Sequence, residues 1–186
     1  MTRLKPTDFI QSVLIKELGI MIEKHPYISF MVMGIGIEFL GKCIDKSVDD
    51  FQQSGNSSAN FKNAIEEIPS LKKYETYLAT HDLYRSFRCG LVHAISPDLK
   101  ITLSSKNEQG HLIMTNGRLN LKVEDFYDDF KVACEFVKDA YYPDNDKMNR
   151  DFLEVPGFGF NEGTNIPTGI TQSISIASGA TRNSKL

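Results

Sequence analysis

The sequence LYRSFRCGLVHAISP, at residues 83–97, has the periodicity of an amphipathic helix. Asp82 precedes it and is suited to cap its first turn, because a short acidic side chain accepts hydrogen bonds from backbone N–H groups there. Pro97 disfavours helical backbone at Ser96, so we expect the helix to end near that residue. One apolar stripe is expected to face the core, formed by Leu83, Phe87, Leu91 and Ala94.

The polar side chains of this helix lie on its outer side. Arg88 flanks the apolar stripe on one side and His93 on the other, and the step of five residues from Arg88 to His93 corresponds to roughly 140° around the helix axis. One helix therefore does not readily bring both side chains to a single site. A second copy packed about a two-fold axis would place Arg88 of one subunit near His93 of the other, which predicts a homodimer through this helix. The surface between them carries Arg85, Cys89 and Val92.

An arginine, four further residues and a histidine near the end of an apolar helix resemble the signature of the HEPN superfamily, the higher eukaryote and prokaryote nucleotide-binding domains. Arg88 and His93 match its spacing, and the residue after the arginine, often polar in active members, is Cys89 here. The resemblance covers roughly residues 7–141 and implies an all-α, HEPN-like helical bundle. Many members are dimeric, metal-independent endoribonucleases with a composite Arg/His site, which implies RNA as partner and no cofactor.

These two side chains suit the cleavage of an RNA phosphodiester. The ribose 2′-hydroxyl would attack the adjacent phosphorus, and one product would carry a 2′,3′-cyclic phosphate. His93 would move protons, since imidazole titrates near neutral pH, and its place near a helix C-terminus favours the cation. Arg88 would stabilise charge on the phosphoryl oxygens through its guanidinium fork. No step needs a metal ion.

Glu38 is a carboxylate in an otherwise apolar segment, and such a group generally needs a partner. Either it faces a helix end or water, or it pairs with Arg85 or Arg88 and holds a guanidinium in place. A structural interpretation also stands, in which Arg88 only pairs with Glu38 and His93 only caps carbonyl groups. A nucleophile at Cys89 lacks an evident oxyanion donor. The predicted site has Arg88 and His93 as catalytic residues, supported by Glu38, Arg85 and Cys89.

Composition limits the class of protein. The chain has 186 residues, of which 41% are hydrophobic and 24% charged, as in an ordinary soluble domain followed by a tail. Its formal net charge of -3 gives no general attraction for nucleic acid, so RNA binding requires a local basic patch. Three widely spaced cysteines fit a reducing cytoplasm better than a disulfide framework or a zinc cluster. Arg3 and Lys5 precede no apolar run long enough for a secretory signal.

Two long helices are expected before the central one. Thr7 or Asp8 can cap the first. The second, at about residues 27–46, is apolar almost all round, which favours a buried helix over a membrane span. Glycines lower its helix propensity and so predict close packing against neighbouring helices. They are Gly34, Gly36 and Gly41.

After Pro97 the spacing of apolar residues changes from the helical period to the alternation that is typical of strands. Residues 100–103 are predicted to form a strand, and residues 111–115 its antiparallel partner, with His111 as a surface or turn residue. Asn116-Gly117 is a strong hairpin turn signal, and residues 119–123 alternate as a third strand. A small antiparallel β-meander at about residues 100–123 is therefore predicted as an insertion in a helical domain, residues 1–142.

A last helix is predicted from Glu124 to Tyr141. Its first turns are acidic, and we interpret Glu124, Asp125, Asp128 and Asp129 as a solvated helix start rather than as metal ligands. The tail, residues 143–186, is rich in glycine, serine and threonine, and is expected to be docked or flexible. Apolar residues suited to docking are Phe152, Val155, Phe158 and Phe160, and residues suited to adding a strand to a protein partner are Ile170, Ile174 and Ile176.

Two classes of function follow from the sequence. The first is a HEPN-like, metal-independent endoribonuclease; the family, rather than these residues, suggests a toxin–antitoxin or defence context. The second is a non-catalytic helical dimerisation module that binds a protein or nucleotide partner. In both classes the helix at residues 83–97 forms the dimer interface.

Overall fold

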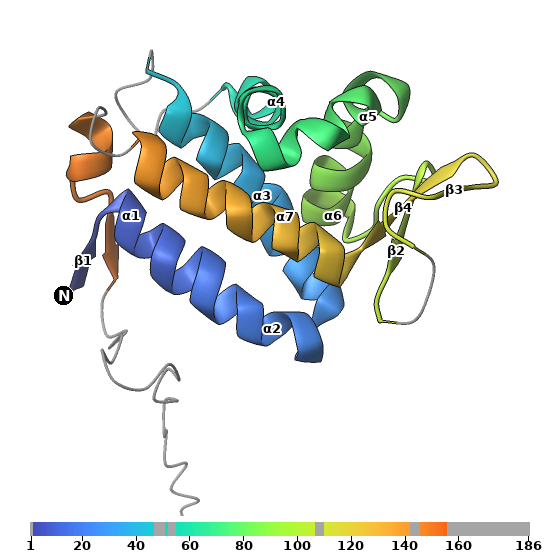
Figure 1. Ribbon diagram of the computed structural model, residues 1–186, viewed down its shortest axis with the longest axis horizontal. Helices are drawn as coiled ribbons and strands as arrows, with labels where there is room; N and C mark the ends of the chain where they lie inside the picture. The colour runs from blue at the N-terminus through green and yellow to red at the C-terminus, as the bar shows by residue number, and fades with distance from the viewer. Residues whose placement is uncertain (1, 47–50, 52–54, 107–109, 142–145, 156–186) are drawn as a thin grey trace, which may run out of the picture.

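One long helix, α3 (Pro26–Ile44), lies at the centre of the fold. The computed structural model describes residues 2–46, 51, 55–106, 110–141 and 146–155. In Figure 1 α1, α2 and α7 lie alongside α3, and a small sheet is placed at the opposite end of the bundle from β1. The chain is therefore predominantly helical, as predicted. Its helices are α1 (Pro6–Phe9), η1 (Ile10–Glu17), α2 (Leu18–Lys24), α3, α4 (Ser57–Glu67), η2 (Pro69–Tyr74), α5 (Glu75–Thr80), η3 (Tyr84–Cys89), α6 (Gly90–Ala94), α7 (Val123–Phe136), η4 (Val137–Tyr141) and η6 (Asp146–Asn149).

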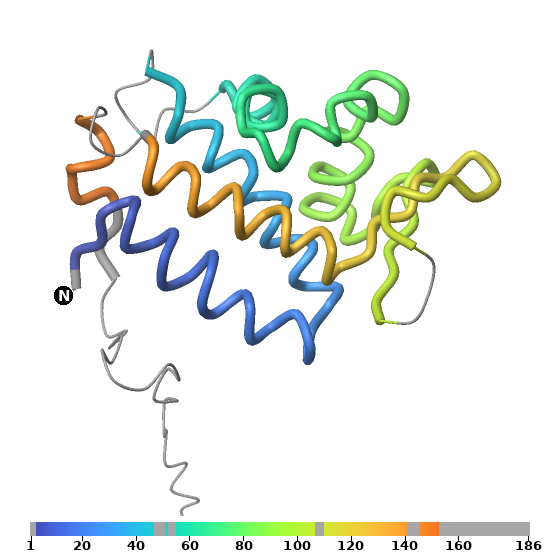
Figure 2. The backbone as a smooth tube through the Cα atoms, in the orientation of Figure 1, coloured from blue at the N-terminus to red at the C-terminus, as the bar shows by residue number. Residues whose placement is uncertain are grey.

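The first helix is built from three successive pieces. Figure 2 shows α1, η1 and α2 as one continuous rod, and the η1 piece is a π-helix. Pro6 occupies the first turn, where its missing N–H has no hydrogen bond to lose. The residues that this helix buries against the core are Ile10, Leu14, Ile15, Leu18 and Ile22.

Aromatic rings from three helices pack against one another in the core. Phe30 of α3 meets Phe87 of η3 edge-on, with ring centroids 6.1 Å apart. Phe87 in turn meets Phe126 of α7 edge-on at 5.3 Å. All three side chains are fully buried, and edge-to-face pairs add about 0.5–1.5 kcal/mol beyond the burial of apolar area. This cluster fixes the helix that carries Arg88 against the centre of the bundle.

Glycines allow close approach to α3, as the sequence predicts. A Cβ atom at Gly36 would overlap the ring of Phe130 on α7. A Cβ atom at Gly41 would overlap the backbone carbonyl of Asn60 on α4. The composition and length of α3 also suit a membrane span, but 56% of its apolar window is buried inside the protein, as is typical of a core helix.

The small sheet differs from the predicted meander. Its strands are β2 (Ile101–Ser104), β3 (Met114–Thr115) and β4 (Arg118–Lys122), in the order β2-β4-β3. The β3–β4 hairpin is antiparallel, and its turn residues Asn116 and Gly117 have φ angles of 51° and 73°, which confirms the predicted turn. However, β2 pairs with β4, in parallel, and not with residues 111–115. Alternation of apolar residues shows which face of a strand is buried, but it does not determine which strand lies beside which.

The first residues of the described tail pack on the helical body. Strand β5 (Leu153–Val155) pairs antiparallel with β1 (Thr2–Leu4). The ring of Phe152 lies 5.6 Å from Phe9 and 5.5 Å from Phe39, so its predicted docking is confirmed. The other predicted tail contacts, of Phe158, Phe160, Ile170, Ile174 and Ile176, lie outside the described residues.

Candidate functional site

The helix that carries Arg88 and His93 is formed by η3 and α6. Asp82 caps it as predicted, because its Oδ1 accepts the Arg85 N–H at 3.4 Å. The helix ends at Ala94, and Ile95 then adopts a left-handed backbone with φ 54°. A Cβ atom at Gly90 would meet the Ser96 carbonyl at 2.7 Å, so the glycine inside the Arg-x4-His segment allows the chain to fold back over its own helix.

Helix α3 and the η3–α6 helix lie side by side in opposite directions. Near the start of α3, the Tyr27 hydroxyl donates to the Ile95 carbonyl at 2.5 Å. Midway along it, a Cβ atom at Gly34 would lie only 3.6 Å from the Arg88 Cα. Further along α3, Glu38 pairs with Arg88. We call this line of contact, from Tyr27–Ile95 to Glu38–Arg88, the α3–α6 seam.

The Glu38–Arg88 ion pair is the strongest polar feature of the α3–α6 seam. Arg88 Nη2 lies 2.6 Å from Glu38 Oε2, and each side chain is 13% exposed. Of the two alternatives that the sequence leaves for Glu38, the structure shows the ion pair, and its partner is Arg88 rather than Arg85. At this depth, loss of one partner leaves the other charge buried, which costs about 3–5 kcal/mol. Arg88 Nε is also buried, and it has no hydrogen-bond partner in the described part of the chain.

Tyr84 and Cys89 flank the arginine on the same helix. The guanidinium carbon of Arg88 lies 5.8 Å from the centre of the Tyr84 ring. Burial raises the pKa of Tyr84, and a hydrogen bond with the Cys89 side chain raises it further, while Arg88 opposes both effects. A hydrogen bond thus joins the Cys89 thiol to the Tyr84 hydroxyl, whereas a nucleophilic thiol needs a base such as an imidazole beside it.

His93 lies on the last turn of α6 and is exposed. Among the described residues its side chain has no hydrogen-bond or ion-pair partner, so it does not cap the carbonyl groups of the helix end. The side chain of Arg85 is also exposed. The structure thus separates the two predicted catalytic residues within one chain: Arg88 lies inside the α3–α6 seam, and His93 faces the solvent.

Both helices of the seam also carry exposed residues. Their buried stripes face one core, since Phe30 of α3 and Phe87 of η3 both contact Phe126. The exposed residues include large apolar side chains, with 46% of Ile28 and of Ile35 and 67% of Ile95 exposed. We call Ile28, Ile35, Ile95 and His93 the outer face.

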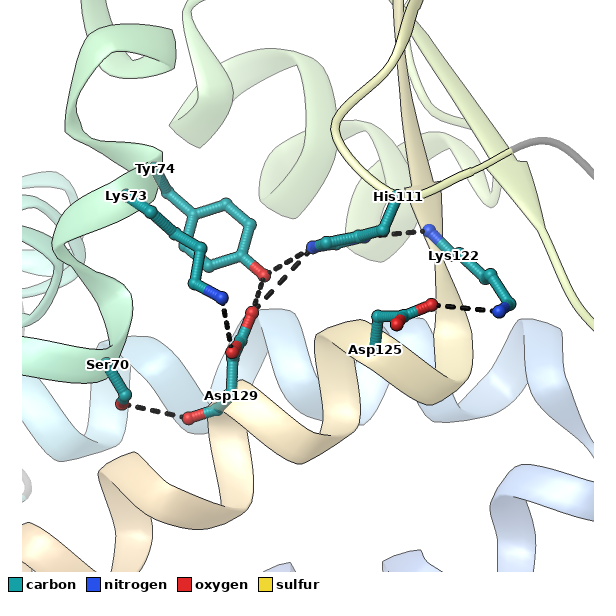
Figure 3. A network of polar contacts seen from close by, with 7 residues as sticks. All are labelled: Ser70, Lys73, Tyr74, His111, Lys122, Asp125 and Asp129. Atoms are coloured by element: carbon teal, nitrogen blue, oxygen red, sulfur yellow. Dashed lines mark hydrogen bonds and ion pairs between the residues drawn. The ribbon is translucent and has the colours of Figure 1, made fainter.

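A second polar cluster was not anticipated from the sequence. Asp129 of α7 accepts a hydrogen bond from the Tyr74 hydroxyl at 2.5 Å and from Lys73 Nζ at 2.7 Å (Figure 3). His111 Nε2 lies 2.7 Å from the same hydroxyl. Asp129 is only 15% exposed, so its interpretation as part of a solvated helix start is wrong. His111 lies in a turn, as predicted, but its side chain is only 11% exposed and belongs to this cluster. The residues come from three distant segments and share no sequence pattern.

The hydrogen bonds fix the protons of this cluster. His111 Nδ1 accepts the Lys122 N–H at 3.1 Å, so the ring proton lies on Nε2 and points to the Tyr74 oxygen. Tyr74 in turn donates to Asp129. Burial lowers the pKa of His111, against the opposing effect of Asp129, and burial raises that of Tyr74. The hydrogen bonds of this cluster join η2, α7 and the segment before β3. No group of three or more potential metal ligands occurs in the described residues.

The free energy of unfolding is expected to fall more steeply below about pH 6.5 in the wild type than in a His111→Gln protein. The pKa of His111 is lower in the folded protein than its ordinary value of 6.5, so the unfolded chain binds the proton more tightly. The contribution of neutral His111 is therefore complete above that ordinary value and is lost as the pH falls through the folded one. Urea titrations at two pH values, one on each side, measure it. Identical pH dependence in the two proteins would contradict a neutral His111.

Comparison with known proteins does not assign a family. No protein-family model, curated protein or solved structure matches the chain. The resemblance to the HEPN superfamily consequently depends on the Arg88–His93 spacing, and any functional conclusion depends on the geometry described above.

Proposed function

We propose that the protein is a metal-independent RNA endonuclease whose site combines Arg88 of one subunit with His93 of a second. The observation that carries the proposal is the separation of these residues: Glu38 holds Arg88 in the α3–α6 seam, whereas His93 is exposed and has no side-chain partner among the described residues. Each half of the predicted pair is thus held in a position from which a second copy can complete it.

Arg88 keeps capacity for a phosphate while it pairs with Glu38. A guanidinium carries five N–H donors, and the ion pair is made through one terminal nitrogen, Nη2. The Nε group is buried, so a phosphate would be met by the terminal N–H groups that the ion pair leaves. Arg88 would stabilise the phosphoryl oxygens, and Glu38 acts as a positioning residue that fixes the plane of the guanidinium. His93 would transfer protons between solvent and the reacting oxygens.

The outer face supplies the surface for the second copy. Ile28, Ile35 and Ile95 are exposed apolar side chains, and burying them about a two-fold axis removes apolar area from water on both subunits. The same axis brings each His93 toward the seam of the other subunit. Dimerisation and assembly of the site are therefore one event in this proposal.

The test is cleavage of mixed-sequence single-stranded RNA by the purified full chain with EDTA present. We expect fragments that end in a 2′,3′-cyclic phosphate, and a dimer by light scattering at the same protein concentration. Retention of cleavage in EDTA supports a mechanism carried by side chains alone. Intact RNA after incubation with a well-folded dimer would contradict the nuclease proposal.

The second candidate is a non-catalytic dimerisation module for a protein or nucleotide partner. The observation that favours it is the depth of the Glu38–Arg88 pair, which binds the two helices of the seam together irrespective of any reaction. A dimer that leaves RNA uncleaved, and that dissociates when Ile28 is replaced by an acidic residue, is the result expected of this candidate. The cytoplasm, and a toxin–antitoxin or defence system, remain the proposed setting of the nuclease.

A further inference from the structure

The small sheet has one apolar and one polar face. Ile101 pairs with Leu119 across β2 and β4, and these residues are buried. Because side chains alternate along a strand, their neighbours point the other way. The other face therefore carries Thr102, which pairs with Asn120, and Arg118, which lies opposite Thr115 on β3.

A cavity of about 410 Å³ opens beside this polar face. Its lining consists of Thr102, Thr115, Asn116 and Arg118, and so draws on all three strands and the hairpin turn. All four side chains carry hydrogen-bond donors, and none is a carboxylate. The chemistry of this lining is that of a site for an anion.

The rigid side of the cavity is held by Asn120. The Thr102 hydroxyl donates to Asn120 Oδ1 at 3.1 Å, and Asn120 Nδ2 donates to Ser104 Oγ at 2.8 Å and to the Gly110 carbonyl at 2.9 Å. Asn120 is only 1% exposed. Its hydrogen bonds fix Thr102 and the strand beside Arg118 before any ligand arrives.

The other side of the cavity offers donors without acceptors. Within the residues that the structure describes, the side chains of Thr115, Asn116 and Arg118 have no hydrogen-bond or ion-pair partner. Arg118 is exposed rather than paired with an acidic residue. A guanidinium beside a hydroxyl and an amide matches the tetrahedral oxygens of a phosphate.

The charge of this insertion opposes that of the whole chain. Residues 99–122 contain four basic residues, Lys100, Lys106, Arg118 and Lys122, against one acidic residue, Glu108, whereas the complete chain has a formal net charge of -3. Lys122 pairs with Asp125 at 3.0 Å, so Lys100, Lys106 and Arg118 carry the excess positive charge. RNA binding by an acidic protein requires a local excess of this kind.

We propose that the cavity at Thr115, Asn116 and Arg118 binds a backbone phosphate of single-stranded RNA, away from the scissile bond. The proposal rests on the nuclease function and adds a substrate-anchoring site to it. Thr102 comes nine positions after His93, so the two lie within about 30 Å of each other even if that segment were fully extended. One strand of RNA can span that distance and contact both.

The test uses a 2′-O-methyl RNA oligonucleotide, which binds but has no 2′-hydroxyl to attack. Binding to the full chain is measured between low and moderate salt for the wild type, Arg118→Ala and Arg150→Ala, the last being an exposed arginine on η6's C-terminal side. We expect Arg118→Ala to weaken binding and to reduce the salt slope by about 0.7, the value for one phosphate contact on a single strand. Arg150→Ala, which removes the same charge elsewhere, should leave the slope unchanged.

Inorganic phosphate provides the second arm, read out by NMR shifts of the Thr115 and Asn116 amides. Shifts that Arg118→Ala abolishes, together with the altered RNA slope, support the proposal. Phosphate-dependent shifts with an unaltered RNA slope would overturn it and assign the cavity to a free phosphate or nucleotide. Absence of both effects would overturn it entirely. Cleavage of ordinary RNA by the wild type is measured separately. If Arg118→Ala reduces the salt slope of RNA binding but the wild type does not cleave RNA, only the nuclease proposal is contradicted. If the wild type cleaves RNA but Arg118→Ala leaves the slope unchanged, only the anchoring site is contradicted.

Discussion

Mixing the Arg88→Ala and His93→Ala proteins is expected to restore RNA cleavage that each protein lacks alone. In a mixed dimer, one of the two composite sites receives its arginine from the His93→Ala subunit and its histidine from the Arg88→Ala subunit. The other site receives neither. Because Arg88 and His93 lie on separate faces of one helix, only an exchange between subunits can produce this result.

The expected magnitudes make the experiment decisive. Loss of a proton-transferring histidine reduces the rate by about 10²–10⁴-fold, and loss of the arginine acts on the same transition state. Random exchange of subunits makes half of the dimers mixed, each with one intact site, so the mixture should recover about a quarter of wild-type activity. Cleavage is measured after co-refolding or co-expression, since a stable dimer exchanges slowly.

Two matched variants distinguish the loss of a catalytic side chain from an unspecific effect of substituting any exposed arginine or histidine. Arg150→Ala and His25→Ala remove the same side chains from other exposed positions and should leave cleavage unchanged. Arg88→Ala also leaves Glu38 buried without its partner, so folding of each variant is checked by thermal unfolding before mixing. If mixed dimers form and the mixture stays inactive, the site lies within one chain and the composite arrangement is wrong.

The predictable part of this structure is the part that local chemistry determines. The helix at residues 83–97 begins at its acidic cap and ends near its proline, because caps and proline act on adjacent backbone. Glu38 was recognisable as an unusual group because a carboxylate in an apolar helix needs either water or a partner, and the structure shows the partner. Arg85 and Arg88 were the two arginines expected within reach of Glu38 in the bundle.

The missed features depend on how distant segments meet. The alternation in residues 100–123 shows which side chains are buried, but β2 could pair with either edge of the hairpin and retain the same buried face. Asp129 and His111 each have an ordinary local context, an acidic helix start and a turn. They become a cluster only when η2, α7 and the segment before β3 pack together. No single-sequence pattern carries that information.

Among the glycines of α3, Gly41 is expected to tolerate alanine least. Replacing each of Gly34, Gly36 and Gly41 by alanine gives the same gain in helix propensity, about 1 kcal/mol, so the three substitutions differ only in what the new methyl group meets. At Gly34 the methyl group would lie 3.3 Å from the Phe87 ring and 3.6 Å from the Arg88 backbone, contacts that a shift of a few tenths of an ångström relieves. The Gly34→Ala protein should therefore be about as stable as the wild type.

At the other two positions the new methyl group overlaps atoms that differ in how easily they can move. At Gly36 the methyl group overlaps the buried Phe130 ring, which can tilt at a cost of about 1–3 kcal/mol. At Gly41 it overlaps the backbone carbonyl of Asn60, so relief requires movement of α4 as a whole, and the loss should exceed about 3 kcal/mol. Urea unfolding of the three proteins measures the order. Equal stability of the Gly41→Ala and Gly34→Ala proteins would show that α4 does not pack against α3 at this carbonyl, and the helix arrangement on which the α3–α6 seam depends would need revision.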